Sequence, residues 1–174
     1  METPKSISDF LAQKKILIAG VSSKKSTPAI SIAKKFAESG YNVTLLHPTL
    51  TEFKGFQAFS TIDSIPDKPD AAFLFTSPGV TEAVTEECIQ SGIPFLWMHN
   101  MLGFCANKGA SLMKDSTSVS AAAVAKAREA GITVITGSCP MQFLEPVDVF
   151  HKCIRWISDK MGNLDENCSK LPGS

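Results

Sequence analysis

Four hydroxyl and two lysine side chains follow the first apolar run of the chain, in residues 20–27. The segment leads into Pro28, and proline is typical of the first position of a helix. Backbone N–H groups at a helix start have no partner within the helix, and the helix dipole favours negative charge there. Residues 20–27 are therefore a candidate phosphate site, with a solvated turn as the other interpretation of the same composition.

A second segment of this kind is Thr76-Ser77-Pro78-Gly79-Val80. Its hydroxyls and proline again predict a helix start with exposed N–H groups, although Thr76 and Ser77 would also serve as ordinary helix caps. If the two segments are neighbours, they could hold a diphosphate and its adenosine. A point charge for a further phosphate could come from three lysines: Lys24, Lys25 and Lys54.

The loop after the first apolar run does not fit the usual nicotinamide dinucleotide site. Such sites use Gly-x-Gly-x-x-Gly, whereas Gly20 is the only glycine of this loop. They also carry an acidic residue at the end of the second strand, where this chain has His47 and Pro48. A nicotinamide-linked oxidoreductase or redox sensor is therefore the second interpretation, in which Lys24 and Lys25 face a 2′-phosphate. For His47, a bond to an adenosine and a bond to backbone groups are equally open.

Catalytic side chains do not form a recognisable set in this sequence. Cys139 would follow the last strand and could react, but a buried, inert cysteine is the favoured interpretation. His99 could face a thioester and is otherwise a solvated loop residue, whereas Trp97 is expected in the core and His151 on a helix surface. The acidic residues are scattered and the five cysteines lack metal-ligand spacing. We therefore predict no catalytic residue, no metal site, and a binding module rather than an enzyme.

The elements that must position these residues alternate between strand and helix. Short apolar runs predict strands, and apolar residues at three- and four-residue spacing predict helices. The expected strands are 15–20, 42–46, 71–76, 93–98 and 132–136, with a short extended piece at 56–59. The expected helices are 28–39, 80–91, 121–130 and 146–161, with a short one at 7–13.

This alternation predicts an α/β fold: a Rossmann-like, open, mostly parallel sheet in a single domain with helices on both faces. Residues 1–162 form the expected domain, and residues 163–174 a flexible tail. The stretch 99–120 is longer than a typical connection. It is a candidate lid, or a surface for a homodimer or a protein partner.

Composition excludes several classes of protein. Of 174 residues, 44% are hydrophobic and 20% charged, which excludes general disorder. Seventeen basic residues balance seventeen acidic ones, so no global field attracts nucleic acid or an anionic membrane. Neither a membrane-spanning apolar run nor a signal-peptide core is present, and five widely spaced cysteines indicate no disulfide framework. A cytoplasmic protein is expected.

The order of several short motifs resembles the stand-alone CoA-binding proteins, which are related to the CoA-binding domain of the succinyl-CoA synthetase α-subunit. The resemblance covers roughly residues 12–143. The matching segments are 16–22, 40–43, 47–48, 52–55, 59–66, 75–78, 97–98 and 130–140. Three positions depart from the family pattern. His47 stands for asparagine, Thr76-Ser77 for Arg-Pro, and His99-Asn100 for the start of Gln-Pro-Gly.

The resemblance implies a protein that binds CoA or an acyl-CoA through its ADP part and acts as a carrier, sensor or regulatory module. The matching ligand positions are Gly20, Val21, Ser22, Lys25, His47, Thr76, Ser77, Pro78 and Val80. A third interpretation is a decayed site, in which residues 99–120 make a protein interface.

Overall fold

The computed structural model of the protein describes residues 3–24, 27–100 and 117–164, which form seven strands and five α-helices. The strands are β1 (Lys15–Ala19), β2 (Asn42–Leu46), β3 (Glu52–Phe53), β4 (Phe56–Phe59), β5 (Ala71–Leu74), β6 (Phe95–Met98) and β7 (Thr133–Thr136). The helices are α1 (Lys5–Leu11), α2 (Pro28–Glu38), α3 (Pro78–Gln90), α4 (Ala121–Glu129) and α5 (Val149–Lys160), with 3₁₀ turns η1 (Ile62–Ser64) and η5 (Pro140–Gln142).

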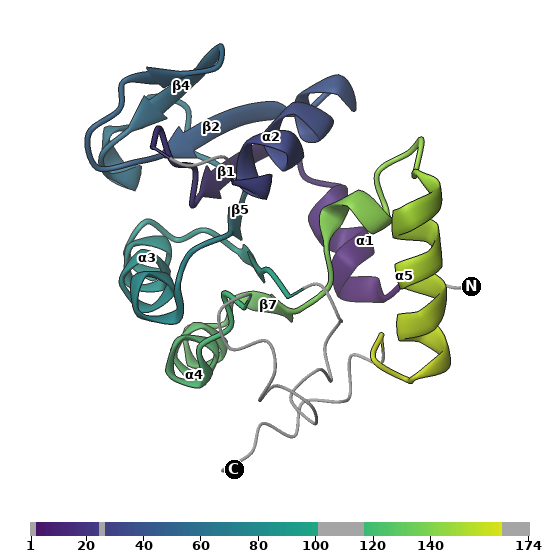
Figure 1. Ribbon diagram of the computed structural model, residues 1–174. Coiled ribbons are helices and arrows are strands. Elements are labelled where there is room, and N and C mark those ends of the chain that lie inside the picture. Colours follow the sequence, from purple (N-terminus) through teal and green to yellow (C-terminus); the bar gives the residue numbers. More distant parts are fainter. Residues whose placement is uncertain (1–2, 25–26, 101–116, 165–174) are drawn as a thin grey trace.

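The strands form one sheet in the order β3-β4-β2-β1-β5-β6-β7 (Figure 1). Every neighbouring pair is parallel except β3 and β4, which form an antiparallel hairpin at one edge. All four residues of β5 are buried, as a strand covered on both faces requires. The predicted open, mostly parallel sheet is confirmed.

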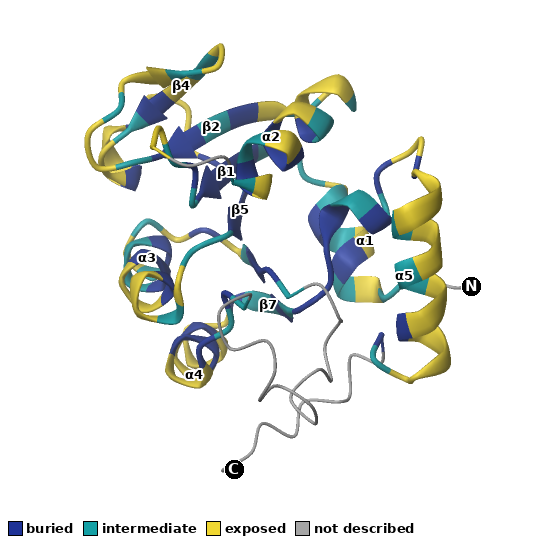
Figure 2. Cartoon of the chain, viewed as in Figure 1, coloured by how far each residue is buried: buried dark blue, intermediate teal, exposed yellow. Residues whose placement is uncertain are grey.

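Helices cover both faces of the sheet (Figures 1 and 2). Successive strand residues point to opposite faces, so Ile16 and Ile18 pack with α1 and α2, while Leu17 and Ala19 pack with α3 and α4. Each face therefore has its own apolar core, with Trp97 fully buried in the first as expected. The Rossmann-like α/β architecture predicted from the sequence is confirmed.

The order of the strands reverses next to β1. From β1 the chain crosses through α2 to β2 on one side, and then returns to β5 on the other side of β1 before continuing to β6 and β7. The switch point therefore lies between β1 and β5, where the backbone N–H of Phe75 donates to the carbonyl of Ala19 (2.9 Å). Open α/β sheets bind ligands outside the carboxyl ends of the strands at such a point.

Helix starts differ from the sequence expectation at two places. Helix α3 begins at Pro78 rather than at residue 80, because Ser77 is its N-cap residue. Helix α5 begins at Val149 rather than at residue 146, because the side chain of Asp148 caps it. The expected starts are based on the spacing of apolar residues, which gives no information about the capping residue. The expected lid or partner surface falls largely on residues 101–116, and the expected tail largely on residues 165–174, both outside the described residues.

Candidate functional site

The loops after β1 and β5 touch through their backbones. Gly20 follows β1 with φ +107°, and a Cβ atom added to it would lie 1.9 Å from the carbonyl oxygen of Phe75. Only glycine fits this approach, because a side chain would clash and the backbone conformation disfavours L residues. The two segments that the sequence analysis singled out are therefore neighbours. We call this region, residues 20–24 with residues 75–80, the β1–β5 rim.

Two helices start at the rim without a side-chain cap. Thr27 precedes α2 and Ser77 precedes α3, each followed by proline, and neither side chain accepts a hydrogen bond from its helix. The Thr27 hydroxyl oxygen is buried and has no hydrogen-bond partner among residues 3–24, 27–100 and 117–164. The N–H groups of each first turn thus receive no hydrogen bond from the side chain of the N-cap residue. Their free N–H groups and helix dipoles make both starts suitable for an anion.

Helices α4 and α5 start differently. The Ser120 hydroxyl accepts from the backbone N–H of Ala123 (3.3 Å) and donates to Glu82 (2.6 Å) at the start of α4. Asp148 accepts from the backbone N–H of His151 (3.0 Å) at the start of α5. Each of these caps satisfies an N–H group of the first turn. Helix α1, which Pro4 precedes, also lacks a side-chain cap, so an open start is not unique to this region. At the switch point, however, both flanking helices have open starts.

The predicted residues after β5 take different positions at the rim. The Thr76 hydroxyl shares a hydrogen bond with the buried Thr81 hydroxyl (2.7 Å), so it faces α3 and caps nothing. Pro78 is the first residue of α3, and Val80 is 50% exposed in its first turn. A Cβ at Gly79 would meet no atom within 4 Å. The first turn of α3 is therefore accessible along Gly79 and Val80.

The predicted ligand residues after β1 differ in which of their atoms are available at the rim. Val21 is buried and packs in the core, so only its backbone is available at the rim. The Ser22 hydroxyl accepts from the backbone N–H of Lys24 (3.2 Å) and shapes the turn. Lys25 lies outside the described residues. The described contribution of this loop is mainly backbone, beginning at Gly20.

His47 follows β2 at the same edge of the sheet. Its Nδ1 accepts hydrogen bonds from the backbone N–H groups of Thr49 and Leu50, both at 3.2 Å. Nδ1 is therefore the unprotonated nitrogen, and a neutral ring carries its proton on Nε2. Of the two interpretations open from the sequence, the bond to backbone groups is present.

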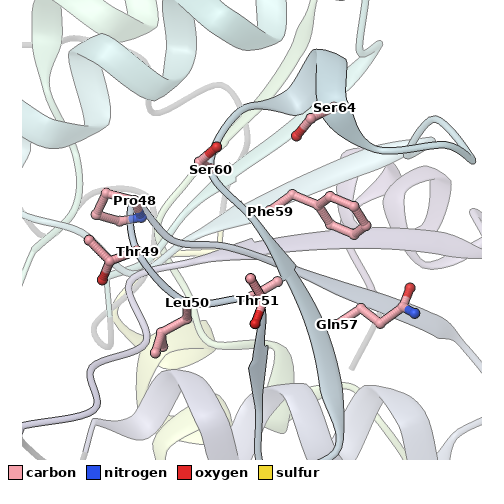
Figure 3. Close-up of a pocket in the computed structure, with 9 residues that line it drawn as sticks. Pro48, Thr49, Leu50, Thr51, Gln57, Phe59, Ser60 and Ser64 are labelled. Carbon is pink, nitrogen blue, oxygen red and sulfur yellow. The ribbon is translucent and has the colours of Figure 1, made fainter.

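A cavity lies past the carboxyl end of β2, at the same edge of the sheet as the rim. Its volume is about 490 Å³, within the range of small-molecule pockets. Figure 3 shows the loop after β2 on one side and β4 with its following residues on the other. The lining combines apolar surface with hydroxyl and amide groups and no charged side chain: Pro48, Thr49, Leu50, Thr51, Gln57, Ala58, Phe59, Ser60 and Ser64.

Sequence reasoning missed this cavity. Its lining comes from two segments that only the pairing of β2 with β4 brings together, through Leu46 opposite Phe59. The signal that could have indicated it is the Pro48 turn directly after a strand, at the edge where such folds bind ligands.

Lys54 is not brought to this edge of the sheet. It lies in the hairpin turn between β3 and β4, where its φ of 55° is left-handed. Because β4 runs parallel to β2, its start and the preceding turn lie toward the amino end of β2. The rim and the cavity both lie at the carboxyl end. The strand register therefore argues against the expectation that Lys54 supplies a charge to a phosphate at the rim.

Two reactive candidates are buried. Burial raises the pKa of the Cys139 thiol to about 12, which keeps it protonated and supports the inert interpretation. His99 follows β6 and is 4% exposed rather than solvated, with its ring 4.6 Å from that of Phe75. Burial lowers the pKa of His99 to about 4, so the ring is neutral at pH 7. Within the part of the chain that the structure describes, its Nδ1 has no hydrogen-bond partner.

Searches for metal and membrane features give two further findings. Residues 3–24, 27–100 and 117–164 contain no group of three or more His, Cys, Asp or Glu side chains placed to hold a metal ion. Within the same residues, no helix combines the length and apolar character needed to cross a bilayer.

A protein-family model described as "CoA binding domain" matches residues 14–145 of the chain. The matched region includes the rim, the cavity and His99. A curated relative, the "Uncharacterized protein YneT" of Bacillus subtilis (strain 168), is 25% identical over 84 residues. That match spans 48% of this chain and 62% of the relative, less than two thirds of its length.

Solved structures share the fold. A hypothetical protein from Pyrococcus horikoshii OT3 is 26% identical with a TM-score of 0.67, covering 84% of this chain and 97% of that one. The dinucleotide forming acetyl-coenzyme A synthetase 1 of Ca. Korarchaeum cryptofilum, in its apo form, is 22% identical with a TM-score of 0.53. That comparison covers 70% of this chain but 25% of the synthetase, so the similarity is to one part of a larger protein.

Proposed function

Because the chain belongs to the CoA binding domain family, we propose that it binds CoA or an acyl-CoA through the ADP part, at the β1–β5 rim and the neighbouring cavity. One observation carries the proposal. The two helices that flank the switch point, α2 and α3, start without side-chain caps, whereas α4 and α5 are capped. A diphosphate would accept hydrogen bonds from the N–H groups that no protein side chain satisfies.

The atoms at the rim suit a diphosphate. At Gly20 the loop lies against the Phe75 carbonyl, so this residue places no side chain between the two helix starts. The buried Thr27 hydroxyl, which no other described residue bonds, could donate to a phosphate oxygen. Gly79 leaves open space before the first turn of α3. Ser22 and Ser77 complete the proposed set, and Lys25 is carried over from the sequence alone.

The adenosine would occupy the cavity after β2. The β1–β5 boundary and the β2–β4 boundary are two strand spacings apart, roughly 10 Å. A nucleoside diphosphate can bridge such a distance, with its base against Phe59 and its ribose beside the hydroxyls of Thr49 and Ser60. The Nε2–H group of His47 would then lie between the rim and the cavity, where it could donate a hydrogen bond to the nucleotide. The remaining part of CoA would leave the rim on the α3 side, past Val80.

A non-catalytic role as carrier, sensor or regulatory module completes the proposal. It is supported by the buried, protonated thiol of Cys139 and the buried, neutral ring of His99. A nicotinamide dinucleotide is less suited, because the cavity after β2 is lined by no carboxylate that could hold a ribose diol. The family match likewise favours CoA.

Calorimetric titration of the full chain with four compounds tests this proposal. CoA and ADP should both bind, because they share the part that the rim and cavity would hold. Pantetheine, which lacks the nucleotide, should give no heat at the same concentrations. NADPH, which also contains an adenosine diphosphate, should bind no more tightly than ADP and more weakly than CoA. Heat with NADPH but none with CoA would indicate that the site binds a nicotinamide dinucleotide and not CoA. Binding of pantetheine with CoA-like affinity would show that the nucleotide part is not what is recognised.

A further inference from the structure

Helix α5 presents an apolar face to solvent. Val149 is 83% exposed, Phe150 59%, Trp156 56% and Met161 67%, and Ile157 is also exposed. Figure 2 shows α5 mostly in the exposed colour at the outside of the molecule. Contiguous exposed apolar residues on a folded protein mark an interaction site.

The opposite side of α5 fixes the helix to the body. Arg155 donates to the carbonyl of Gln142 (3.3 Å) and to the Thr3 hydroxyl (2.9 Å), and its guanidinium lies 4.5 Å from the centre of the Phe143 ring. Ser158 is buried on the same side. The outward face is therefore set by the packing of the helix and is not a result of a loose helix.

The outward residues have the spacing of a helix–helix contact. Val149, Cys153, Trp156 and Lys160 follow one another at intervals of four, three and four residues, which is the pattern of a coiled-coil seam. One flank of this seam is apolar and is formed by Phe150 and Ile157. The other flank is charged, with Lys152 and Asp159 one heptad apart.

We propose that α5 docks against α5 of a second copy of this chain, antiparallel about a two-fold axis. When two helices pair antiparallel, like flanks meet. Lys152 then faces Asp159 of the partner subunit, and the symmetry repeats this pair with the roles exchanged. Phe150 faces the partner subunit's Ile157 on the other flank, and Trp156 packs over the partner's Cys153. Lys160 lies at the end of the seam, where its charge reaches water.

The charge pattern selects this partner over the alternatives. A parallel pairing would bring the charged flank of one helix against the apolar flank of the other, leaving Lys152 and Asp159 unpaired. A lipid surface would bury the apolar residues but would not require Lys152 and Asp159 to lie one heptad apart on the same flank. Only the antiparallel copy matches both flanks at once.

The association is expected to be weak and concentration-dependent. A helix of 12 residues is about 18 Å long. A pair of such helices buries less than the roughly 1,200–2,000 Å² of a standard interface. We expect dimers to form in the micromolar range.

Sedimentation velocity of the full chain, from about 5 to about 500 µM, tests the pairing. The mean mass should rise from 18.7 kDa toward twice that value. Lys152→Asp alone and Asp159→Lys alone each create like charges facing each other twice, and should shift dimerisation to about tenfold higher concentration. The double variant restores opposite charges and should restore dimerisation. Trp156→Glu should abolish it, and Lys34→Glu, an exposed change on α2, should have no effect.

Each other outcome overturns the proposal. A chain that stays monomeric at every concentration has no such interface. Charge variants that leave the dimer unchanged, or a double variant that fails to rescue it, would exclude the antiparallel seam even if Trp156→Glu disrupts the dimer. Flotation of monomer with phosphatidylcholine–phosphatidylglycerol vesicles would assign the face to a lipid surface. Circular dichroism of every variant shows whether it has kept the fold.

Discussion

Two pairs of helices in this molecule start in different ways. Helices α4 and α5 are each capped by a side chain of their own N-cap residue, Ser120 and Asp148. Helices α2 and α3 are not, although Thr27 and Ser77 are residue types that commonly cap helices. The capped starts are complete within the protein. The open starts flank Gly20 at the switch point, and their N-cap side chains leave first-turn N–H groups available to a ligand.

The difference shows which helix starts are stabilised by a side-chain cap and which are not. A capping bond contributes about 1 kcal/mol to a helix start. Two starts without caps forgo that contribution in the free protein. A ligand that supplies the missing hydrogen-bond acceptors would provide this stabilisation instead, because a ligand that binds only the folded state stabilises the folded state. The central claim of the account is that a diphosphate acts as the shared cap of α2 and α3.

The largest expected effect comes from the contact that brings the open starts together. Gly20→Ala should lower the free energy of unfolding by about 4 kcal/mol, because the new Cβ meets the Phe75 carbonyl oxygen at 1.9 Å in a strained backbone conformation. Gly40→Ala is the matched control, since Gly40 also has positive φ (+85°) but no atom within 4 Å. It should cost about 1 kcal/mol. Urea denaturation measures both. Equal losses would show that the close approach does not matter.

A somewhat smaller effect is expected from His99, beside the rim. Its pKa is about 4 when folded and 6.5 ordinarily, so between these pH values the unfolded chain binds a proton that the folded protein does not. Stability should therefore fall by about 3 kcal/mol as the pH drops from 7 to 4, and this contribution should not change below pH 4.

Urea denaturation over this pH range, repeated with His99→Gln, isolates the residue. The variant should lose most of the slope between pH 6.5 and 4, whatever its stability at pH 7. A slope that stays the same would assign the pH dependence to other groups.

Deleting the capping side chains sharpens the comparison directly. Ser120→Ala and Asp148→Ala should each cost about 1 kcal/mol, because each removes a bond to a first-turn N–H. Thr27→Ala and Ser77→Ala should change stability by less than about 0.5 kcal/mol without ligand, since neither side chain caps its helix. Thermal denaturation measures all four. Similar losses at all four positions would mean that α2 and α3 are capped in solution.

The smallest expected effect concerns the lysines. Lys24→Ala should weaken CoA binding about twofold, because an exposed lysine near a bound phosphate contributes only a few tenths of a kcal/mol at physiological salt. Lys54→Ala should leave the affinity unchanged, since the register places Lys54 toward the other edge of the sheet. Titration with CoA compares the two. A larger loss for Lys54→Ala would contradict the placement of the nucleotide.

Most of the fold could be predicted from the sequence, because it depends on local signals. Short apolar runs such as that of β5 indicate strands buried on both faces. Proline at positions 28 and 78 indicates the two helix starts at the rim. Glycine at position 20 is explained only by the structure, where the nearby Phe75 carbonyl leaves no room for a side chain.

The features that could not be predicted depend on which distant segments lie side by side. Local sequence signals do not contain this information. The cavity requires the pairing of β2 with β4, and the same register carries Lys54 away from it. The periodicity of α5 indicates an apolar face but does not say whether this chain covers it. His99 looks like a loop residue in the sequence, and its burial follows from its position beside Phe75.

The most direct measurement is CoA titration of Gly79→Asp beside Ala122→Asp. Each substitution places a carboxylate at the second residue of a helix, in the open start of α3 or the capped start of α4. The open space around Gly79 admits the side chain, and a carboxylate there favours the helix dipole. The account predicts that Gly79→Asp stays folded and loses CoA affinity at least about tenfold, through competition with the diphosphate, while Ala122→Asp binds like wild type. Unchanged affinity in folded Gly79→Asp would contradict the claim that a diphosphate caps α3.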